Sequence, residues 1–87
     1  MAKIQIEPEA GDAFTVTVHS RITTTHRVTL TDSDFERLSQ AGGTKEDLIR
    51  RSFEFLLRRE PNTSILSSFD LPVIGRYFPE YESVMGK

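Results

Sequence analysis

Two histidines are the residues of this chain best suited to acid–base or metal chemistry. His19 and His26 are its only histidines, and the chain contains no cysteine. Each lies in a stretch where polar and apolar residues alternate, which is typical of a β-strand whose side chains point to opposite faces in turn. This alternation places His19 on the polar face and His26 on the apolar face. We therefore do not expect the two to bind one cation, and we predict no metal site.

The remaining polar residues are not spaced for catalysis. No serine has a histidine base placed beside it, as nucleophilic catalysis requires. Glu80 and Glu82 fall in a segment that we predict to be a loose tail, whereas acid–base catalysis needs carboxylates in a fixed geometry. Gly42 and Gly43 lack the glycine spacing of a phosphate-binding loop. We therefore expect neither enzymatic activity nor a cofactor.

Length and composition favour a single small domain. The chain has 87 residues, of which 37% are hydrophobic and 28% charged, with a formal net charge of −2. The lack of cysteine excludes disulfides and thiolate metal sites. The first residues alternate and contain no apolar run, so we predict neither a signal peptide nor a membrane span, and we expect a cytoplasmic location. The net acidic charge argues against general affinity for nucleic acids.

The first thirty residues predict a β-meander. Ile4 and Ile6 alternate with polar neighbours, which is the period of a half-buried strand. Pro8 and Gly11 set backbone angles that strands avoid, so they indicate a turn. The alternation then continues through two further strands, and their outer face is rich in threonine. We predict strands at residues 3–7, 13–19 and 22–30.

The same alternation limits how the second and third strands pair. Their apolar residues share one face only if the paired residue numbers give an even sum, because a shift of one residue turns every side chain over. Val18 opposite Val28 and Val18 opposite His26 both satisfy this condition. In either register Arg27 lies on the threonine-rich face, which we expect to be solvated.

Three helices are predicted in the rest of the chain. Thr31, with Asp34 three residues later, is placed to cap the first helix, and Thr44 is placed to cap the second. Asp70 is placed to cap the last helix, and Pro72 falls in its first turn. We predict these helices at residues 32–41, 45–59 and 71–78, followed by a frayed or docking tail at 79–87.

The second helix is unusually apolar. Its apolar residues cover roughly 200° of a helical wheel, whereas the stripe of an ordinary surface helix is nearer 100° wide. One sheet face cannot cover such an arc, so either the C-terminal segment or a second subunit must cover the excess. Residues of this arc are Leu48, Ile49, Ser52, Phe53, Phe55, Leu56 and Leu57. Overall we predict an α+β domain in which two main helices cover one face of a three-stranded antiparallel meander, with a short C-terminal helix at an edge.

Residues 25–58 resemble the ribbon-helix-helix repressors. The resemblance lies in a Thr25-His26-Arg27-Val28-Thr29-Leu30 strand, a short helix, Gly42-Gly43-Thr44 and an apolar helix. It implies a dimer whose paired strands enter the DNA major groove, with Thr25, Arg27 and Thr29 facing the bases and Thr44 holding a phosphate. A DNA-binding transcriptional regulator is therefore our alternative interpretation.

The C-terminal half is similar to a family of short bacterial proteins of unknown role. The similarity runs from Arg51-Ser52-Phe53-Glu54-Phe55 through Glu60-Pro61-Asn62 to Arg76-Tyr77-Phe78-Pro79-Glu80-Tyr81, and it implies no activity. It draws attention to Arg76, Tyr77, Tyr81 and Glu82, which form either a lid over the apolar arc or a partner-docking surface. Our leading interpretation is a non-enzymatic binding or adaptor domain that acts through a homodimer or a protein partner.

Overall fold

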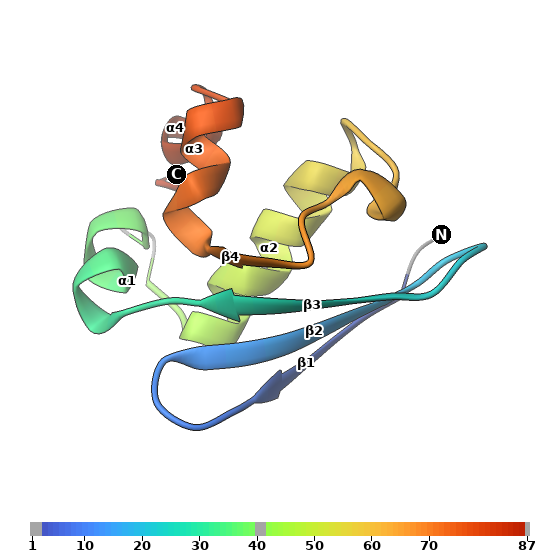
Figure 1. The fold of residues 1–87 in the computed structure, drawn as a ribbon. Helices are drawn as coiled ribbons and strands as arrows, with labels where there is room; N and C mark the ends of the chain where they lie inside the picture. Colours follow the sequence, from blue (N-terminus) through green and yellow to red (C-terminus); the bar gives the residue numbers. More distant parts are fainter. Residues whose placement is uncertain (1–2, 40–41, 87) are drawn as a thin grey trace.

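A four-stranded mixed sheet carries the helices of the protein on one side (Figure 1). The computed structural model describes residues 3–39 and 42–86. The described strands are β1 (Lys3–Pro8), β2 (Ala13–His19), β3 (Thr24–Thr29) and β4 (Ser68–Asp70), in the sheet order β1-β2-β3-β4. The first three pair in antiparallel fashion, while β4 runs parallel to β3. The predicted α+β class is confirmed, and the predicted three-stranded antiparallel sheet is corrected to a four-stranded mixed one.

The sequence did not predict the fourth strand, because β4 is short and pairs with a strand that is distant in the chain. It has three residues, too few for an alternating pattern to emerge. Its pairing depends on the helical crossover that parallel neighbours require, here made by the chain between β3 and β4. Arg27 N donates to the Ser67 carbonyl at 2.8 Å, and the Thr29 hydroxyl donates to the Asp70 carboxylate. Asp70 therefore ties β4 to β3 and does not cap a helix, contrary to prediction.

The β2–β3 register obeys the predicted even sum, but both predicted pairings are wrong. Val16 lies opposite His26, and Val18 lies opposite Thr24. Residues 19–23 connect Val18 to its partner Thr24, and this connection is shorter than the one that either predicted pairing would give. The length of the turn fixes the register of a hairpin. The even sum nevertheless buries Val16, Val18 and Val28 on one face.

The first two helices begin where their caps predicted. The Thr31 hydroxyl accepts from Asp34 N at 3.1 Å at the start of α1 (Asp32–Leu38). At the start of α2 (Lys45–Leu57), Thr44 Oγ1 accepts from Asp47 N at 3.1 Å and Thr44 N donates to Asp47 Oδ2 at 3.2 Å, which completes a capping box. Residues 40–41 of the predicted first helix lie outside the described residues. The second helix ends two residues before its predicted end, where the chain tightens because Arg59 N donates to the Leu56 carbonyl, three residues back, at 2.9 Å.

The C-terminal segment differs most from prediction. The predicted helix at 71–78 is a 3₁₀ turn (Leu71–Val73) followed by the short helix α3 (Ile74–Tyr77), and the predicted tail contains a further helix, α4 (Tyr81–Met85). Tyr81 and Met85, one helical turn apart, are both buried, so their packing holds the segment in place. Residue 87 of the predicted tail lies outside the described residues.

The apolar arc of α2 is covered within the chain itself. Phe55 packs edge-on against Phe78, with ring centroids 5.8 Å apart, and against Tyr81 at 5.4 Å. On the sheet side, Phe53 contacts the rings of His26 and Phe69. The C-terminal segment therefore provides the cover that the sequence required. No helix in residues 3–39 and 42–86 is long and apolar enough to cross a membrane.

Candidate functional site

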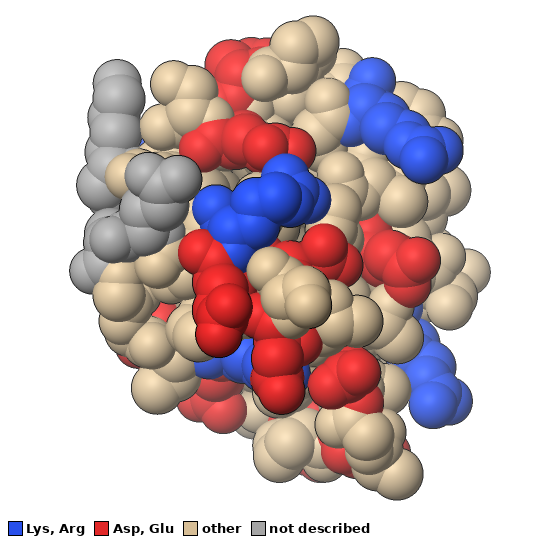
Figure 2. All heavy atoms as spheres, turned by 90° about the vertical axis from the view of Figure 1, so that its left-hand side faces the viewer, with Lys and Arg blue, Asp and Glu red and all other residues tan. Residues whose placement is uncertain are grey.

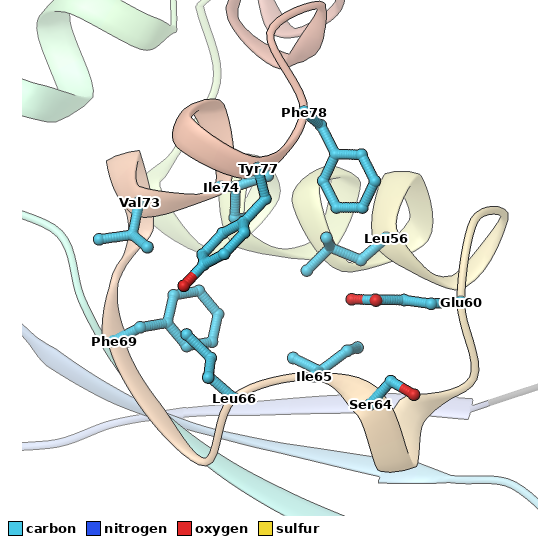
Figure 3. Close-up of a pocket in the computed structure, with 10 residues that line it drawn as sticks. All are labelled: Leu56, Glu60, Ser64, Ile65, Leu66, Phe69, Val73, Ile74, Tyr77 and Phe78. Atoms are coloured by element: carbon cyan, nitrogen blue, oxygen red, sulfur yellow. The ribbon is translucent and has the colours of Figure 1, made fainter.

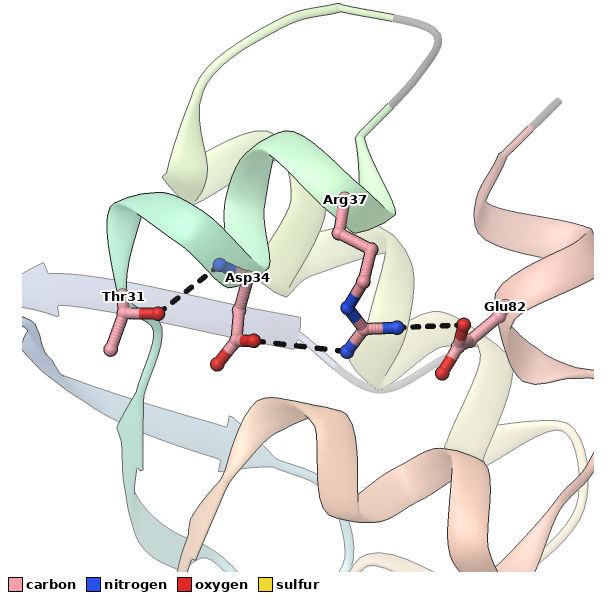
Figure 4. Close-up of polar contacts among 4 residues, drawn as sticks. All are labelled: Thr31, Asp34, Arg37 and Glu82. Atoms are coloured by element: carbon pink, nitrogen blue, oxygen red, sulfur yellow. Dashed lines mark hydrogen bonds and ion pairs between the residues drawn. The ribbon is translucent and has the colours of Figure 1, made fainter.

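The structure separates the four predicted partner-binding residues. Arg76 and Tyr77 are exposed on α3, whereas Tyr81 is fully buried. The exposed Glu82 carboxylate accepts a hydrogen bond from Arg37 Nη1 at 2.8 Å, and this contact joins α4 to α1 (Figure 4). This hydrogen bond to Glu82 raises the pKa of Arg37. Of the four, Tyr77 is the residue that lines a surface groove.

The candidate DNA-binding residues do not adopt a ribbon-helix-helix arrangement. Arg27 is exposed on the open sheet face, but β3 pairs with β2 on one side and β4 on the other within the same chain. In the described structure, residues 27–29 of β3 therefore have no open edge for the strand of a second subunit. At the second helix, the Thr44 amide already donates to the Asp47 carboxylate, which places a negative charge where a phosphate would bind. No feature of the described structure favours the DNA-binding interpretation.

The two histidines lie on opposite faces of the sheet, as predicted. His19 is partly exposed and forms a hydrogen bond of 2.6 Å with Gln5. His26 is 2% exposed and packs against the ring of Phe53. Within the described residues, no three His, Cys, Asp or Glu side chains are gathered as they would be around a metal ion.

An apolar groove of about 340 Å³ opens between the C-terminal end of α2 and α3 (Figure 3). Its floor is formed by buried side chains, among them Leu56, Ile65 and Ile74. Its rim includes Leu66, which is 46% exposed, and Tyr77, which is 65% exposed. The other lining residues are Glu60, Ser64, Phe69, Val73 and Phe78. These residues come from several different elements, so only the folded chain brings them together.

Glu60 is the one charged side chain among the described residues that line this groove. Its carboxylate points inward, between Phe78 and Ile65 (Figure 3). The described residues offer it no ion pair. The nearby Arg59 is occupied, because it stacks on Phe55 at 3.6 Å and its Nε lies 3.4 Å from the Glu80 carboxylate. The groove therefore combines an apolar surface with one negative charge.

A chain of hydrogen bonds fixes residues 62–66, which form the lower wall of the groove, to the sheet. Asn62 Nδ2 donates to Thr24 Oγ1 at 2.8 Å and to the Ile22 carbonyl at 2.7 Å. His26 Nδ1 donates to the Leu66 carbonyl at 2.7 Å, so in the neutral imidazole Nε2 accepts from the Thr24 hydroxyl, 2.8 Å away. Because Asn62 and His26 are buried, these bonds hold residues 62–66 firmly.

The upper wall of the groove is formed by α3, and buried contacts in the core hold it in place. The Tyr81 hydroxyl lies 2.7 Å from Ser52 Oγ, which itself donates to the Leu48 carbonyl at 2.7 Å. Burial raises the pKa of Tyr81 to about 12, an effect that the hydrogen bond with Ser52 partly offsets. This contact anchors α4 to α2, and α4 in turn packs against α3. The wall that carries Tyr77 therefore rests on a buried support.

The opposite end of the molecule has a different character. Acidic side chains gather around the end where α1 and the β1–β2 turn lie (Figure 2). Lys45 Nζ lies 2.7 Å from Asp32 and 3.4 Å from Asp12, and the hydrogen bond to Asp32 raises the pKa of Lys45. These ion pairs lie at the surface, where the Asp12 and Asp32 side chains are 50% and 89% exposed, so the groove with its apolar floor is the stronger candidate site.

The sequence singled out Tyr77, which lines the groove, but did not predict the groove itself. The signal that could have suggested it is the apolar cluster Ile65, Leu66 and Phe69, which follows Pro61 a few residues after the end of the second helix. Leu66, the exposed member of this cluster, lines a groove only because α3 lies beside it. Comparisons of the chain with protein-family models, curated proteins and solved structures found no match.

Proposed function

We propose that this chain is a cytoplasmic, non-enzymatic binding domain that holds a segment of a protein partner in its apolar groove. The observation that carries this proposal is the exposure of Leu66 and Tyr77 at the rim of a buried apolar floor. Exposed apolar surface that is continuous with a concave floor marks interaction sites. Tyrosine also suits interfaces, because its ring is apolar and its hydroxyl remains solvated.

The size of the groove supports a peptide side chain as its occupant. Sites for small molecules and cofactors span about 300–1,000 Å³, and this groove of about 340 Å³ lies at the lower limit. It suits one or two bulky apolar side chains from a peptide, which act as anchors in the way that interface hot spots do.

The charge of the groove narrows the partner further. The Glu60 carboxylate faces the space that an anchor would fill. Excluding water there strengthens its attraction for a cation, so we expect a lysine or arginine beside the anchor residue. Arg76 lies next to Tyr77 in the sequence and is exposed, where it can contact the rest of the partner segment.

Selection of random peptides displayed on phage tests this function. We expect the protein to enrich peptides with a bulky apolar residue adjacent to lysine or arginine. Leu66→Asp should abolish binding of the selected peptides, because it introduces a charge at the apolar rim. Glu60→Gln should retain the apolar anchor preference and lose the preference for the basic residue.

Two variants control for loss of the fold. Leu66→Ala removes apolar contact without adding charge and should weaken binding to an intermediate degree. Thr63 lies in the 3₁₀ turn Asn62–Ser64 and outside the groove lining, so Thr63→Ala should bind like the wild type. The proposal is wrong if no peptide is enriched, or if the enriched peptides bind Leu66→Asp as well as they bind the wild type.

A further inference from the structure

Strand β1 offers an open edge opposite the groove side of the sheet. It is the outermost strand, and no strand in the described residues pairs with its outer side. The Ile4 carbonyl points outward, since it accepts from Arg50 Nη1 at 2.8 Å, whereas Glu9 N points inward to the Ala13 carbonyl. Because backbone groups alternate along an antiparallel strand, Ile4 and Ile6 present their N–H and C=O groups to the open edge.

The charges along β1 are arranged for pairing with a second copy of itself. Lys3 and Glu7 lie on the open sheet face, on either side of Gln5. If two β1 strands pair in antiparallel fashion with Gln5 facing Gln5, Lys3 of each copy lies opposite Glu7 of the other. Opposite charges directly across a strand pair stabilise it. From this match we propose that β1 pairs with β1 of a second copy of this chain in that register.

Neighbouring registers are less favourable. With Ile4 facing Ile4, each Lys3 lies opposite Gln5, and both opposite-charge pairs are lost. With Ile6 facing Ile6, each Ile4 lies opposite Pro8, which has no N–H to donate. A further shift in either direction places Lys3 opposite Lys3 or Glu7 opposite Glu7. The register centred on Gln5 alone combines two opposite-charge pairs with N–H donors at both outward-facing residues.

The same register also satisfies the backbone and the apolar side chains. Ile4 of one copy lies opposite Ile6 of the other, and their outward N–H and C=O groups form hydrogen bonds across the dimer. The half-buried Ile6 side chain gains an isoleucine neighbour on the core face. Arg50 must release the Ile4 carbonyl, which makes this arginine a competitor for the edge. The resulting dimer has one continuous sheet, built from the strands of both copies, and two separate grooves.

Charge exchange between two variants tests this pairing. We expect sedimentation analysis of the wild type to show a weak dimer. Lys3→Glu sets two glutamates opposite each other, and Glu7→Lys sets two lysines opposite each other, so each change should raise the dimer Kd about tenfold or more. Mixing the two variants should restore association, because every cross-strand pair between unlike copies is again of opposite sign. Both residues are exposed, and circular dichroism should show unchanged folds.

Hydrogen exchange supplies a second readout that depends on the strand alternation. Dimerisation should slow exchange at the Ile4 and Ile6 amides as protein concentration rises. The Gln5 amide, which points toward β2, should respond less. The proposal is overturned if the wild type remains monomeric at millimolar concentration, if the mixed variants associate no better than each alone, or if the Ile4 and Ile6 amides show no dependence on concentration. The groove lies elsewhere, so peptide binding and dimerisation can fail independently.

Discussion

The two edges of the sheet are built on different principles. At one edge, β4 has only three residues and is held by the chain around it. The loop that precedes it is tied to the sheet by the bonds of Asn62, Thr24 and His26. At the other edge, β1 has six residues, and on its outer side the Ile4 carbonyl accepts a hydrogen bond from Arg50.

This difference separates an edge that buried bonds hold in place from an edge whose charges remain exposed. Buried polar bonds are costly to break, so the β4 side keeps a groove of fixed shape. Exposed charges contribute little to folding, so the β1 side is free to select a partner by sign and register.

His26→Leu should destabilise the protein by about 3 kcal/mol. The substitution removes the donor for the Leu66 carbonyl and the acceptor for the Thr24 hydroxyl, and both hydrogen bonds are partly buried. His19→Leu is the matched control, because that side chain lies on the solvated face, and it should change stability by less than about 0.5 kcal/mol. Urea denaturation measures both. Equal effects at the two histidines would contradict the role given to the β4 side.

Tyr81→Phe should cost about 1 kcal/mol at neutral pH, because Ser52 loses a hydrogen-bond partner. The wild type carries a phenol whose pKa is raised by burial to about 12. Its contribution to stability is therefore full below about pH 10, the unfolded pKa, and is lost as the pH rises toward 12. The loss amounts to about 2 kcal/mol by pH 12.

The phenylalanine variant has no such titration, so it should match the wild type near pH 11 and exceed it by pH 12. Denaturation at a series of alkaline pH values measures this crossing. A constant difference between the two proteins from pH 7 to 12 would show that Tyr81 is not held in the core as described.

Glu82→Ala should destabilise the protein by only about 0.5 kcal/mol. Glu82 and Arg37 form an ion pair at 2.8 Å between α4 and α1, but their side chains are 51% and 48% exposed. Water and salt therefore screen the pair, and the effect should vanish in molar salt. Thermal melts at low and high salt test this. A loss of several kcal/mol that persists in salt would mean that the ion pair, rather than the buried contacts, holds α4.

Lys3→Glu should have the smallest effect on folding, below about 0.5 kcal/mol for the monomer. Its side chain is exposed at the β1 edge. The same substitution should nevertheless weaken self-association about tenfold, so the folding and association effects separate. Denaturation at low concentration and sedimentation at high concentration measure the two quantities. A monomer as destabilised as that of His26→Leu would contradict the contrast between the edges.

Local patterns determined much of this structure from the sequence alone. Alternation located β1, β2 and β3 and separated His19 from His26, because side-chain direction along a strand depends only on position. Thr31 and Thr44 located the starts of two helices, because an N-cap bonds to residues of its own first turn. The over-wide apolar arc of α2 also required a cover, whatever its source.

Only the tertiary structure decided the source of that cover and the position of the groove. Tyr81 and Met85 fold back onto α2, and β4 joins β3 across about forty residues of intervening chain. Such contacts depend on loop closure and on packing between distant segments, which no local pattern encodes. The sequence by itself thus determined which surfaces were apolar, while the fold decided that Leu66 and Tyr77 would remain exposed together at one groove.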